Sequence, residues 1–362
     1  MSVVSARRSL PRVFLGLAIF LLVALVVFYR YRAGESAEWF DWQAFVLWMR
    51  SLNKQALLLA LLAIYSTYIL RSLRWQQLTR PIAETKMMNL LVATVIGYTG
   101  VFLLGRPAEV VRPLLIARRE KLRVASMLGV ALFERVHDVL AILFWMGFGL
   151  LLMPVEPAVD GSDSALLSVA GQAGWLALAV ALVVMFLLGV WRWQSKKILS
   201  WVEKFLRFLP YGLHHRLSDL LHPFSEGWRS VEHTKVLLTT FGYSVLIWFL
   251  VLVAHYLTCW SAGGALARIS FGGITILLAM GILGSSLLIP GIGGGYQAAT
   301  FVTLTTLFGA EVEVAAGVAV LLWLLTFAAV AVVGVPLMIR EGLSLGELRR
   351  MSRKREETPD AL

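Results

Sequence analysis

Long apolar runs, each close to the length needed to cross a lipid bilayer, limit what this chain can fold into more than any other feature. A helix of about 20 apolar residues crosses the roughly 30 Å hydrocarbon core of a membrane. About eight such runs recur along the sequence, at residues 13–28, 55–70, 87–104, 124–153, 166–190, 236–259, 271–289 and 314–338. They predict an all-α, polytopic helical membrane protein.

The composition agrees with lipid as the surroundings of these runs. Of the 362 residues, 59% are hydrophobic and 15% are charged, whereas soluble domains have about 45–50% and about 25%. The single cysteine, Cys259, excludes an intrachain disulfide. The net charge of +11 is expected to face the anionic cytoplasmic leaflet of a membrane, and no nucleic-acid partner is expected.

The first apolar run is predicted to remain in the protein as a span. Three arginines precede it, as in a signal peptide, but Arg30 and Arg32 follow it directly. No small-x-small cleavage site occurs before Trp39. The next stretch, residues 38–49, mixes indole rings with acids, which is typical of a short helix lying at a membrane surface.

Basic residues orient the runs by the positive-inside rule. Residues 153–165 contain acids but no Lys or Arg and are placed outside, whereas residues 191–235 contain eight Lys and Arg and are placed inside. Basic clusters flank residues 87–104 on both sides, so a full crossing there would put one cluster outside. We therefore expect this run to enter the membrane and return to the same side. The expected break points are Gly97, Gly100, Gly105 and Pro107.

The second half repeats this pattern with opposite polarity. Residues 271–309 must begin and end outside, and a glycine-rich turn interrupts their apolar run. This turn contains Pro290, Gly291, Gly293, Gly294 and Gly295. We expect about six full spans plus two inverted re-entrant segments, with both termini cytoplasmic, so that 27 of the 33 Lys and Arg lie inside. The alternative is a plain bundle of eight spans.

A single transmembrane domain is expected over residues 1–340. Within it, residues 191–235 combine basic and aromatic residues with apolar positions at helical spacing. This combination predicts a basic amphipathic cytoplasmic loop lying on the inner leaflet. A charged cytoplasmic tail is expected at 341–362.

Charged residues follow the first expected turn at intervals of three. Arg106, Glu109 and Arg112 would lie along one helical face, where Glu109 can pair with either arginine. Such a cluster is either part of a polar site or an ordinary cytoplasmic helix end with surface ion pairs.

A second charged cluster lies inside the apolar run 124–153. Glu134 and Asp138, four residues apart, share a helical face, and Arg135 lies three residues before Asp138. An ionisable group at membrane depth costs about 2.5 kcal/mol or more, so such groups pair with one another or line a polar pathway. The cluster is therefore either an internal ion-pair lock or part of a path for a charged headgroup.

Neither a metal centre nor a cofactor is expected. Glu134-x-x-His137 resembles half of a di-iron signature, but no second Glu-x-x-His occurs inside a span. The glycine turn at 291–295 lacks the Gly-Lys-Ser/Thr ending of a phosphate-binding loop.

Four short motifs occur in one order along the chain. They are Arg71-x-x-Arg74-Trp75, Gly105-Arg106-Pro107-Ala108-Glu109-x-x-Arg112, Glu134-Arg135-x-x-Asp138 and Pro290-Gly291-x-Gly293-Gly294. In this order they resemble the lysylphosphatidylglycerol synthase transmembrane-region family, also called flippase-like membrane proteins, over roughly residues 10–340. The chain departs from the family pattern at Ala108, Gln297 and Trp323, where glycine, an acid and arginine are usual.

The resemblance implies a multi-pass protein of a bacterial inner membrane that moves a lipid between leaflets and is not an enzyme. In full-length synthases this module is attached to a soluble aminoacyl-transferase domain, for which the 24 residues after Met338 are too few. The expected partners are membrane lipids with anionic phospholipid headgroups, and a separate cytoplasmic synthase or glycosyltransferase is a further candidate. The alternatives are an intramembrane transferase acting on a lipid-linked substrate and a membrane scaffold for such a cytoplasmic enzyme. No oligomeric state is predicted.

These considerations give two sets of candidate residues. Substrate binding and transport are expected at Arg71, Arg74, Arg106, Glu109, Arg112, Glu134, Arg135 and Asp138. The gate and its turns are expected at Gly97, Gly100, Pro290, Gly291, Gly293, Gly294, Gly295 and Gln297.

Overall fold

A computed structural model describes residues 40–152, 172, 174–184, 234–289, 293–344 and 346–348. Almost all of these residues are helical, and the predicted all-helical class is confirmed. The exception is a short antiparallel pair, β1 (Leu288–Ile289) with β2 (Gly293–Gly294). The expected first span, most of the segment 153–235 and the residues Pro290 and Gly291 lie outside the described residues.

A short helix is present where one was expected, as α2 (Trp42–Ser51), and its position at a membrane surface stays a prediction. It begins after Asp41, because the Asp41 carboxylate accepts the backbone N–H groups of Gln43 and Ala44 at 2.7 and 3.1 Å. Several of its apolar side chains, including Trp42 and Leu47, are exposed, as expected for a helix in contact with lipid.

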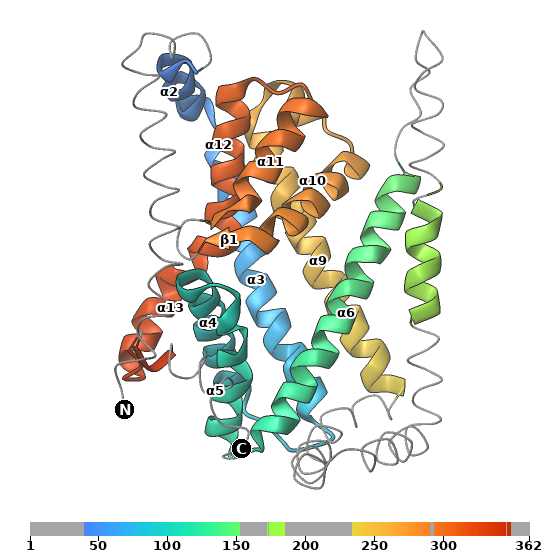
Figure 1. Ribbon diagram of the computed structural model, residues 1–362, viewed down its shortest axis with the longest axis vertical. Coiled ribbons are helices and arrows are strands. Elements are labelled where there is room, and N and C mark those ends of the chain that lie inside the picture. Colours follow the sequence, from blue (N-terminus) through green and yellow to red (C-terminus); the bar gives the residue numbers. More distant parts are fainter. Residues whose placement is uncertain are drawn as a thin grey trace, which may run out of the picture.

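Long apolar helices form the body of the molecule (Figure 1). Within the described residues, four helices are long and apolar enough to cross a membrane: Lys54–Thr79 (α3), Met87–Leu104 (α4), Thr234–Ala262 (α9) and Val312–Arg340. The last is continuous but contains a π-helical stretch, Leu324–Ala328, between α12 (Val312–Trp323) and α13 (Ala329–Arg340). Helix α6 (Val124–Leu151) is of similar length but carries charged residues in its middle.

The first half contains a helical hairpin, residues 87–120, which we call the first hairpin. Helix α4 ends at Gly105, whose φ of 78° suits glycine. A 3₁₀ turn, Arg106–Val110, then leads into α5 (Val111–Glu120), which packs back against α4. The return arm is therefore α5, with its arginines, and not the second part of residues 87–104 as expected.

The expected turns at Gly97 and Gly100 are wrong, because both residues lie inside the continuous helix α4. Gly97 instead allows a close approach between the arms of the first hairpin. A methyl group added there would lie 2.6 Å from Cβ and 3.3 Å from Cα of Arg112 on α5. Gly100 has more space, since its added methyl group would meet Cβ of Ala108 at 3.5 Å.

Alanine at these two glycines should therefore have different effects on stability. Both substitutions gain about the same helix propensity, roughly 1 kcal/mol. The difference between their free energies of unfolding therefore isolates the clash of the added methyl group with Arg112. We expect Gly97→Ala to unfold about 1–3 kcal/mol more easily than Gly100→Ala, because overpacking pushes α5 away from α4. Equilibrium unfolding of both variants in the same detergent measures this difference, and equal stability would contradict the close approach.

The second half contains a matching hairpin, residues 271–306, which we call the second hairpin. Helix α10 (Phe271–Gly284) is followed by a short 3₁₀ turn and the β1–β2 pair, and α11 (Gly295–Thr306) returns beside α10. Gly294 has a φ of 91°, and its N–H donates to Oε1 of Gln297 at 2.7 Å. Gln297 therefore caps the start of α11.

The two halves have the same order of elements and opposite directions. Each consists of a long helix, a hairpin and another long helix, with α3 and α6 flanking the first hairpin and α9 and α12–α13 flanking the second. Helices α3 and α9 are antiparallel neighbours, and the start of α3 meets the end of α9 where Asn53 N donates to Ser261 O at 3.3 Å. In Figure 1 the first hairpin occupies the lower part of the molecule and the second hairpin the upper part.

Candidate functional site

Charged side chains from three helices converge in the half of the molecule that contains the first hairpin. Arg71 and Arg74 come from α3, Arg112 from α5, and Glu134 and Asp138 from α6. We call these five residues the charged cluster. All five are buried, and Arg74 and Glu134 have no exposed side-chain surface.

Arg74 joins α3 to both neighbouring helices. Its Nη1 donates to Oδ1 of Asp138 and to Oγ of Ser244 on α9, both at 2.6 Å. Its Nη2 donates to the Glu134 carboxylate. A guanidinium group can make these contacts together because its planar fork presents several N–H donors in fixed directions.

Glu134 receives three donors. Arg74 and Arg112 each form an ion pair with one of its carboxylate oxygens, and Trp75 Nε1 donates to Oε2 at 2.8 Å. The contact with Arg112 holds the return arm of the first hairpin against α6. Glu134 is therefore the point through which α3, α5 and α6 are held together.

Aromatic rings form much of the wall around the arginines. The guanidinium carbon of Arg112 lies 4.8 Å from the ring centroid of Trp75, and that of Arg71 lies 5.0 Å from the ring centroid of Tyr98. Such cation–π contacts stabilise a guanidinium group where water is excluded. Arg71 is the least constrained arginine, because its Nη1 is 3.9 Å from Oδ2 of Asp138.

The sequence pattern did not single out two residues of α9 that complete the cluster. Ser244 contacts Arg74, and Trp248 Nε1 donates to Oδ1 of Asp138 at 3.3 Å. The available signal was the spacing of polar atoms in an apolar run, since Ser244 and Trp248 are four residues apart and share a helical face.

The remaining candidates for substrate binding lie at the rim of the charged cluster. The side chains of Arg135 and Glu109 are 45% and 42% exposed, and Arg135 Nη2 lies 3.7 Å from Oε2 of Glu109. Arg106 is exposed, and its Nη2 lies 3.5 Å from Oγ of Ser285 in the second hairpin. Arg106 therefore brings the turns of the two hairpins together.

The charge of the cluster is not balanced. Within the five residues, three guanidinium groups face two carboxylates, which leaves a net charge of +1. Arg135 at the rim adds a further guanidinium group, whose Nη1 lies 3.7 Å from Oδ2 of Asp138. Three buried guanidinium nitrogens have no hydrogen-bond partner among the described residues: Arg71 Nε, Arg74 Nε and Arg112 Nη1. A buried donor without a partner costs about 1–3 kcal/mol. The cluster can therefore accept a further anionic group with hydrogen-bonding oxygens.

The glycine residues expected at the gate are not part of the charged cluster. Gly97 lies where α4 packs against α5, and Gly100 lies where α4 packs against the 3₁₀ turn Arg106–Val110. Gly293 and Gly294 form β2 in the second hairpin. Gly295 begins α11, and Gln297 caps this helix. Their gating role remains a prediction.

The described residues contain no group of three or more His, Cys, Asp or Glu side chains that could hold a metal ion. His137, the histidine of the half-signature, is buried, and its Nδ1 donates to the carbonyl oxygen of Phe133 at 3.1 Å. Its Nε2 lies 3.3 Å from Oγ1 of Thr240. His137 therefore links α6 to α9 through ordinary hydrogen bonds.

Long apolar helices with lipid-compatible surfaces, enclosing a charged cluster, define a multi-pass helical membrane protein. Away from the helix ends, the exposed side chains of α3 and α13 are apolar, as at Leu58, Leu62, Val332 and Ile339. The chain matches the family model described as lysylphosphatidylglycerol synthase TM region over residues 13–334, and it therefore belongs to this family. Neither a curated protein nor a solved structure matches the chain.

Proposed function

We propose that this protein moves an anionic or headgroup-modified (glyco)phospholipid between the leaflets of a bacterial inner membrane. The observation that carries the proposal is the net positive charge of the buried cluster, together with its guanidinium N–H groups that lack partners. Phosphate oxygens form strong, charge-assisted hydrogen bonds with arginine. A lipid headgroup could therefore supply acceptors for these N–H groups and offset the excess positive charge of the cluster.

The proposed topology has about six full spans and two inverted re-entrant hairpins. The arms of the second hairpin contain 14 and 12 residues and reach about 21 and 18 Å at 1.5 Å per residue, less than the roughly 30 Å of hydrocarbon. Helix α5 returns beside α4, which favours this topology over a bundle of eight spans. Basic residues at the base of the first hairpin, such as Lys86 and Arg118, favour a cytoplasmic base and cytoplasmic termini.

The gate is proposed where the turns of the two hairpins meet. Arg106 and Ser285 approach each other there from opposite halves of the fold. Transporters built from inverted repeats bind substrate near the contact between the repeats, where broken helices end. Separation of the two turns would connect the charged cluster with the opposite half of the membrane.

The alternative of an intramembrane transferase is less favoured. A general base needs a carboxylate that is free to accept a proton from the substrate. Glu134 already receives three donors, and Asp138 is bound by Arg74 and Trp248. We therefore propose a transporter and not an enzyme, with membrane lipids as the principal partners and a separate cytoplasmic synthase or glycosyltransferase as the source of a modified lipid.

Reconstitution in liposomes tests this proposal directly. Phosphatidylglycerol and its aminoacylated and glycosylated relatives, each labelled in the headgroup, are followed from one leaflet to the other. We expect Arg71→Gln to reduce the flux about tenfold or more, because one charge-assisted hydrogen bond is worth about 1.5–3 kcal/mol. The fold should survive, since the ion pair of Arg71 with Asp138 is 3.9 Å long and its other contact described above is with the ring of Tyr98.

Arg118→Gln on α5 is the matched control, because Arg118 is exposed and lies outside the charged cluster. It should transport like the unchanged protein. Absence of flux for every one of these lipids, with the protein folded, would overturn the proposal. Formation of a new lipid species would instead favour the transferase.

A further inference from the structure

A buried histidine lies in the half of the molecule that contains the second hairpin. His255 on α9 has no exposed surface, and both of its ring nitrogens are hydrogen-bonded. Nδ1 lies 2.8 Å from the carbonyl oxygen of Val251, and Nε2 lies 2.9 Å from the hydroxyl oxygen of Tyr296 on α11. Because a carbonyl oxygen can only accept, Nδ1 carries the proton of the neutral ring, and Nε2 accepts the O–H of Tyr296.

The place of this pair in the second half corresponds to that of the arginines in the first half. Tyr296 is the second residue of the return arm α11, as Arg112 is of the return arm α5. His255 lies near the end of the long helix α9, as Arg74 does in α3. The inverted halves thus have polar groups at equivalent positions of the long helix and of the return arm.

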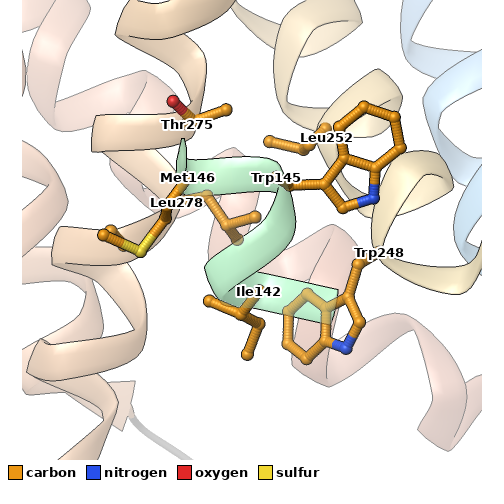
Figure 2. A pocket seen from close by; sticks show the side chains of 8 residues that line it. Ile142, Trp145, Met146, Trp248, Leu252, Thr275 and Leu278 are labelled. Atoms are coloured by element: carbon orange, nitrogen blue, oxygen red, sulfur yellow. The ribbon is translucent and has the colours of Figure 1, made fainter. Parts of the chain in front are cut away.

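An apolar layer separates His255 from the charged cluster. Figure 2 shows a small pocket in this layer, between α6, α9 and α10, where Ile142, Trp248 and Leu252 line the wall. Trp248 binds Asp138 of the charged cluster. His255 lies seven residues beyond Trp248 on α9, about 10 Å further along the helix axis. His255 is therefore a separate site.

The helices around His255 carry no charged residues in their inner parts. Asp, Glu, Lys and Arg are absent from residues 236–262 of α9, 271–306 of the second hairpin and 314–339 of the last span. They are also absent from the parts of α3 and α6 that run along α9 beyond the charged cluster, residues 56–64 and 139–151. A proton on His255 would therefore place a positive charge where these helices supply none.

The groups that can interact with a protonated His255 are few. The titratable side chains beside it are Tyr296 and Cys259, which is buried one helical turn further along α9. No carboxylate of the described residues lies close enough to pair with it. The charged residues at the outer ends of the surrounding elements are not buried; they are Lys54, Arg268, Glu311 and Glu313.

Protonation would reverse the hydrogen bond between α9 and α11. Both nitrogens of an imidazolium ring are donors, so Nε2 would donate to the Tyr296 oxygen, and the Tyr296 O–H would need another acceptor. Thr300 lies beside Tyr296 and one turn further along α11. It is completely buried, and its Oγ1 has no hydrogen-bond partner among the described residues. The pair therefore has one hydrogen-bonded arrangement for each protonation state.

Tyr296 contacts the other elements of the second half as well. A methyl group added at Gly281 on α10 would lie 2.7 Å from Cε2 of Tyr296, so the ring packs directly on this helix. The ring centroid of Phe327, in the π-helical stretch of the last span, is 5.2 Å from that of Tyr296. Single π-helical turns are frequent at functional sites. A change in the hydrogen bond of Tyr296 therefore acts where α9, both arms of the second hairpin and the last span meet.

We propose that His255 binds a proton and that the protein moves its anionic lipid together with that proton. The proton would bind at Nε2 from water on one side of the membrane and leave to water on the other side with the lipid. A buried positive charge without a partner is costly, so the imidazolium is favoured only while the anionic headgroup is in the second half. This inference rests on the proposed function and adds its energy source.

Liposomes with a pH difference of about one unit across the membrane test this inference. The full chain is reconstituted with headgroup-labelled phosphatidylglycerol, and potassium with valinomycin holds the membrane potential at zero. We expect the labelled lipid to accumulate about tenfold in the leaflet that faces the higher pH, since one pH unit is a tenfold ratio of protons. His255→Gln keeps an acceptor for the Tyr296 O–H but binds no proton, so this variant should lose the accumulation.

Solid-state NMR of the same liposomes, with nitrogen-15 in the histidines, gives a readout that does not depend on flux. The His255 signal, assigned by its absence from His255→Gln, should gain imidazolium when phosphatidylglycerol replaces phosphatidylcholine. Tyr296→Phe should weaken proton binding about tenfold, because the Nε2–H would lose its acceptor. Tyr65→Phe is the matched control and should leave proton binding unchanged, since the Tyr65 hydroxyl donates to the carbonyl oxygen of Ala329 at 2.7 Å.

The two measurements separate failure of the inference from failure of the proposed function. Flux that leads to no accumulation under the pH difference would overturn the inference and leave the proposed function standing. A His255 signal that stays neutral with phosphatidylglycerol, or that responds equally in Tyr296→Phe and Tyr65→Phe, would also overturn the inference alone. Absence of flux for every lipid, with the protein folded, would overturn the proposed function and the coupling together.

Discussion

Glu134→Gln is expected to lower the free energy of unfolding by about 3–5 kcal/mol, the typical cost of removing one partner from a buried ion pair. The substitution keeps the shape of the side chain and removes its charge. Arg74 and Arg112 would then face a neutral amide, and only Asp138 would remain to balance the guanidinium groups of the charged cluster. The loss should be large because the Glu134 side chain is completely buried.

Equilibrium unfolding in mixed micelles measures this effect, and Glu109→Gln is the matched control. Glu109 is 42% exposed, and its ion pair with Arg135 is 3.7 Å long. Exposed pairs contribute about 1 kcal/mol or less, so this control should unfold like the unchanged protein. Equal stability of the two variants would show that Glu134 does not hold α3, α5 and α6 together.

The Glu134 prediction also bears on the two interpretations of the charged residues in α6 that the sequence left open. An ion-pair lock and a headgroup site were alternatives because both place charged residues inside an apolar run. The structure contains the ion pairs of a lock, yet the cluster keeps one positive charge and three guanidinium nitrogens that have no partner in the part of the chain that the structure describes. The carboxylates thus position the arginines. An anionic ligand would bind to the positive charge that the carboxylates leave uncompensated.

Much of the fold could be predicted from the sequence because lipid imposes simple requirements. A charged residue inside an apolar run must find a partner, so Glu134 and Asp138 were expected to pair or to line a polar pathway. A return to the same side was also expected within residues 87–104, since basic clusters on both sides of one run cannot both lie inside after a full crossing. The structure instead keeps residues 87–104 as one helix and places the turn at Arg106–Val110 and the return arm in α5.

The exact turns could not be predicted, because a glycine in an apolar run has two common roles. It can end a helix, as Gly105 does with a positive φ, or admit a close neighbour, as Gly97 does for Arg112. Only the position of α5 distinguishes these roles. Gln297 is a similar case. It caps α11 by accepting the N–H of Gly294, and its place in the sequence does not distinguish this capping role from a role in the gate.

The contributions of α9 were missed for a related reason. Ser244 and Trp248 are common in membrane helices and carry no charge, so their sequence context did not mark them. Their contacts with Arg74 and Asp138 arise because α9 packs along α3 and beside α6. The four-residue spacing of Ser244 and Trp248 places both on one helical face, but the helices that this face contacts are set by the pairing of the two halves of the fold.

Substitution of Arg74 should separate the role of charge from that of geometry. Arg74→Met leaves Glu134 and Asp138 without their shared partner, and we expect a loss of about 3–5 kcal/mol in the free energy of unfolding. It also reduces the net charge of the cluster from +1 to 0, so lipid flux should be lost.

Arg74→Lys keeps the charge but replaces a planar fork by a single ammonium group. One nitrogen cannot reproduce the contacts that Nη1 and Nη2 make with Asp138, Ser244 and Glu134. Because at least one charge-assisted hydrogen bond is lost, we expect a destabilisation of about 1.5–3 kcal/mol, with flux partly retained. Arg71→Lys should cost less stability than Arg74→Lys, since the ion pair of Arg71 with Asp138 is already 3.9 Å long.

The two measurements must be made on the same preparations, with unfolding in mixed micelles and flux in liposomes. If Arg74→Lys were as stable as the unchanged protein, the forked contacts of Arg74 would not stabilise the junction of α3, α6 and α9. If Arg74→Met stayed folded and transported normally, the positive charge of the cluster would not attract the substrate. The first result would revise the structural role of Arg74, and the second would remove the principal support for an anionic headgroup site.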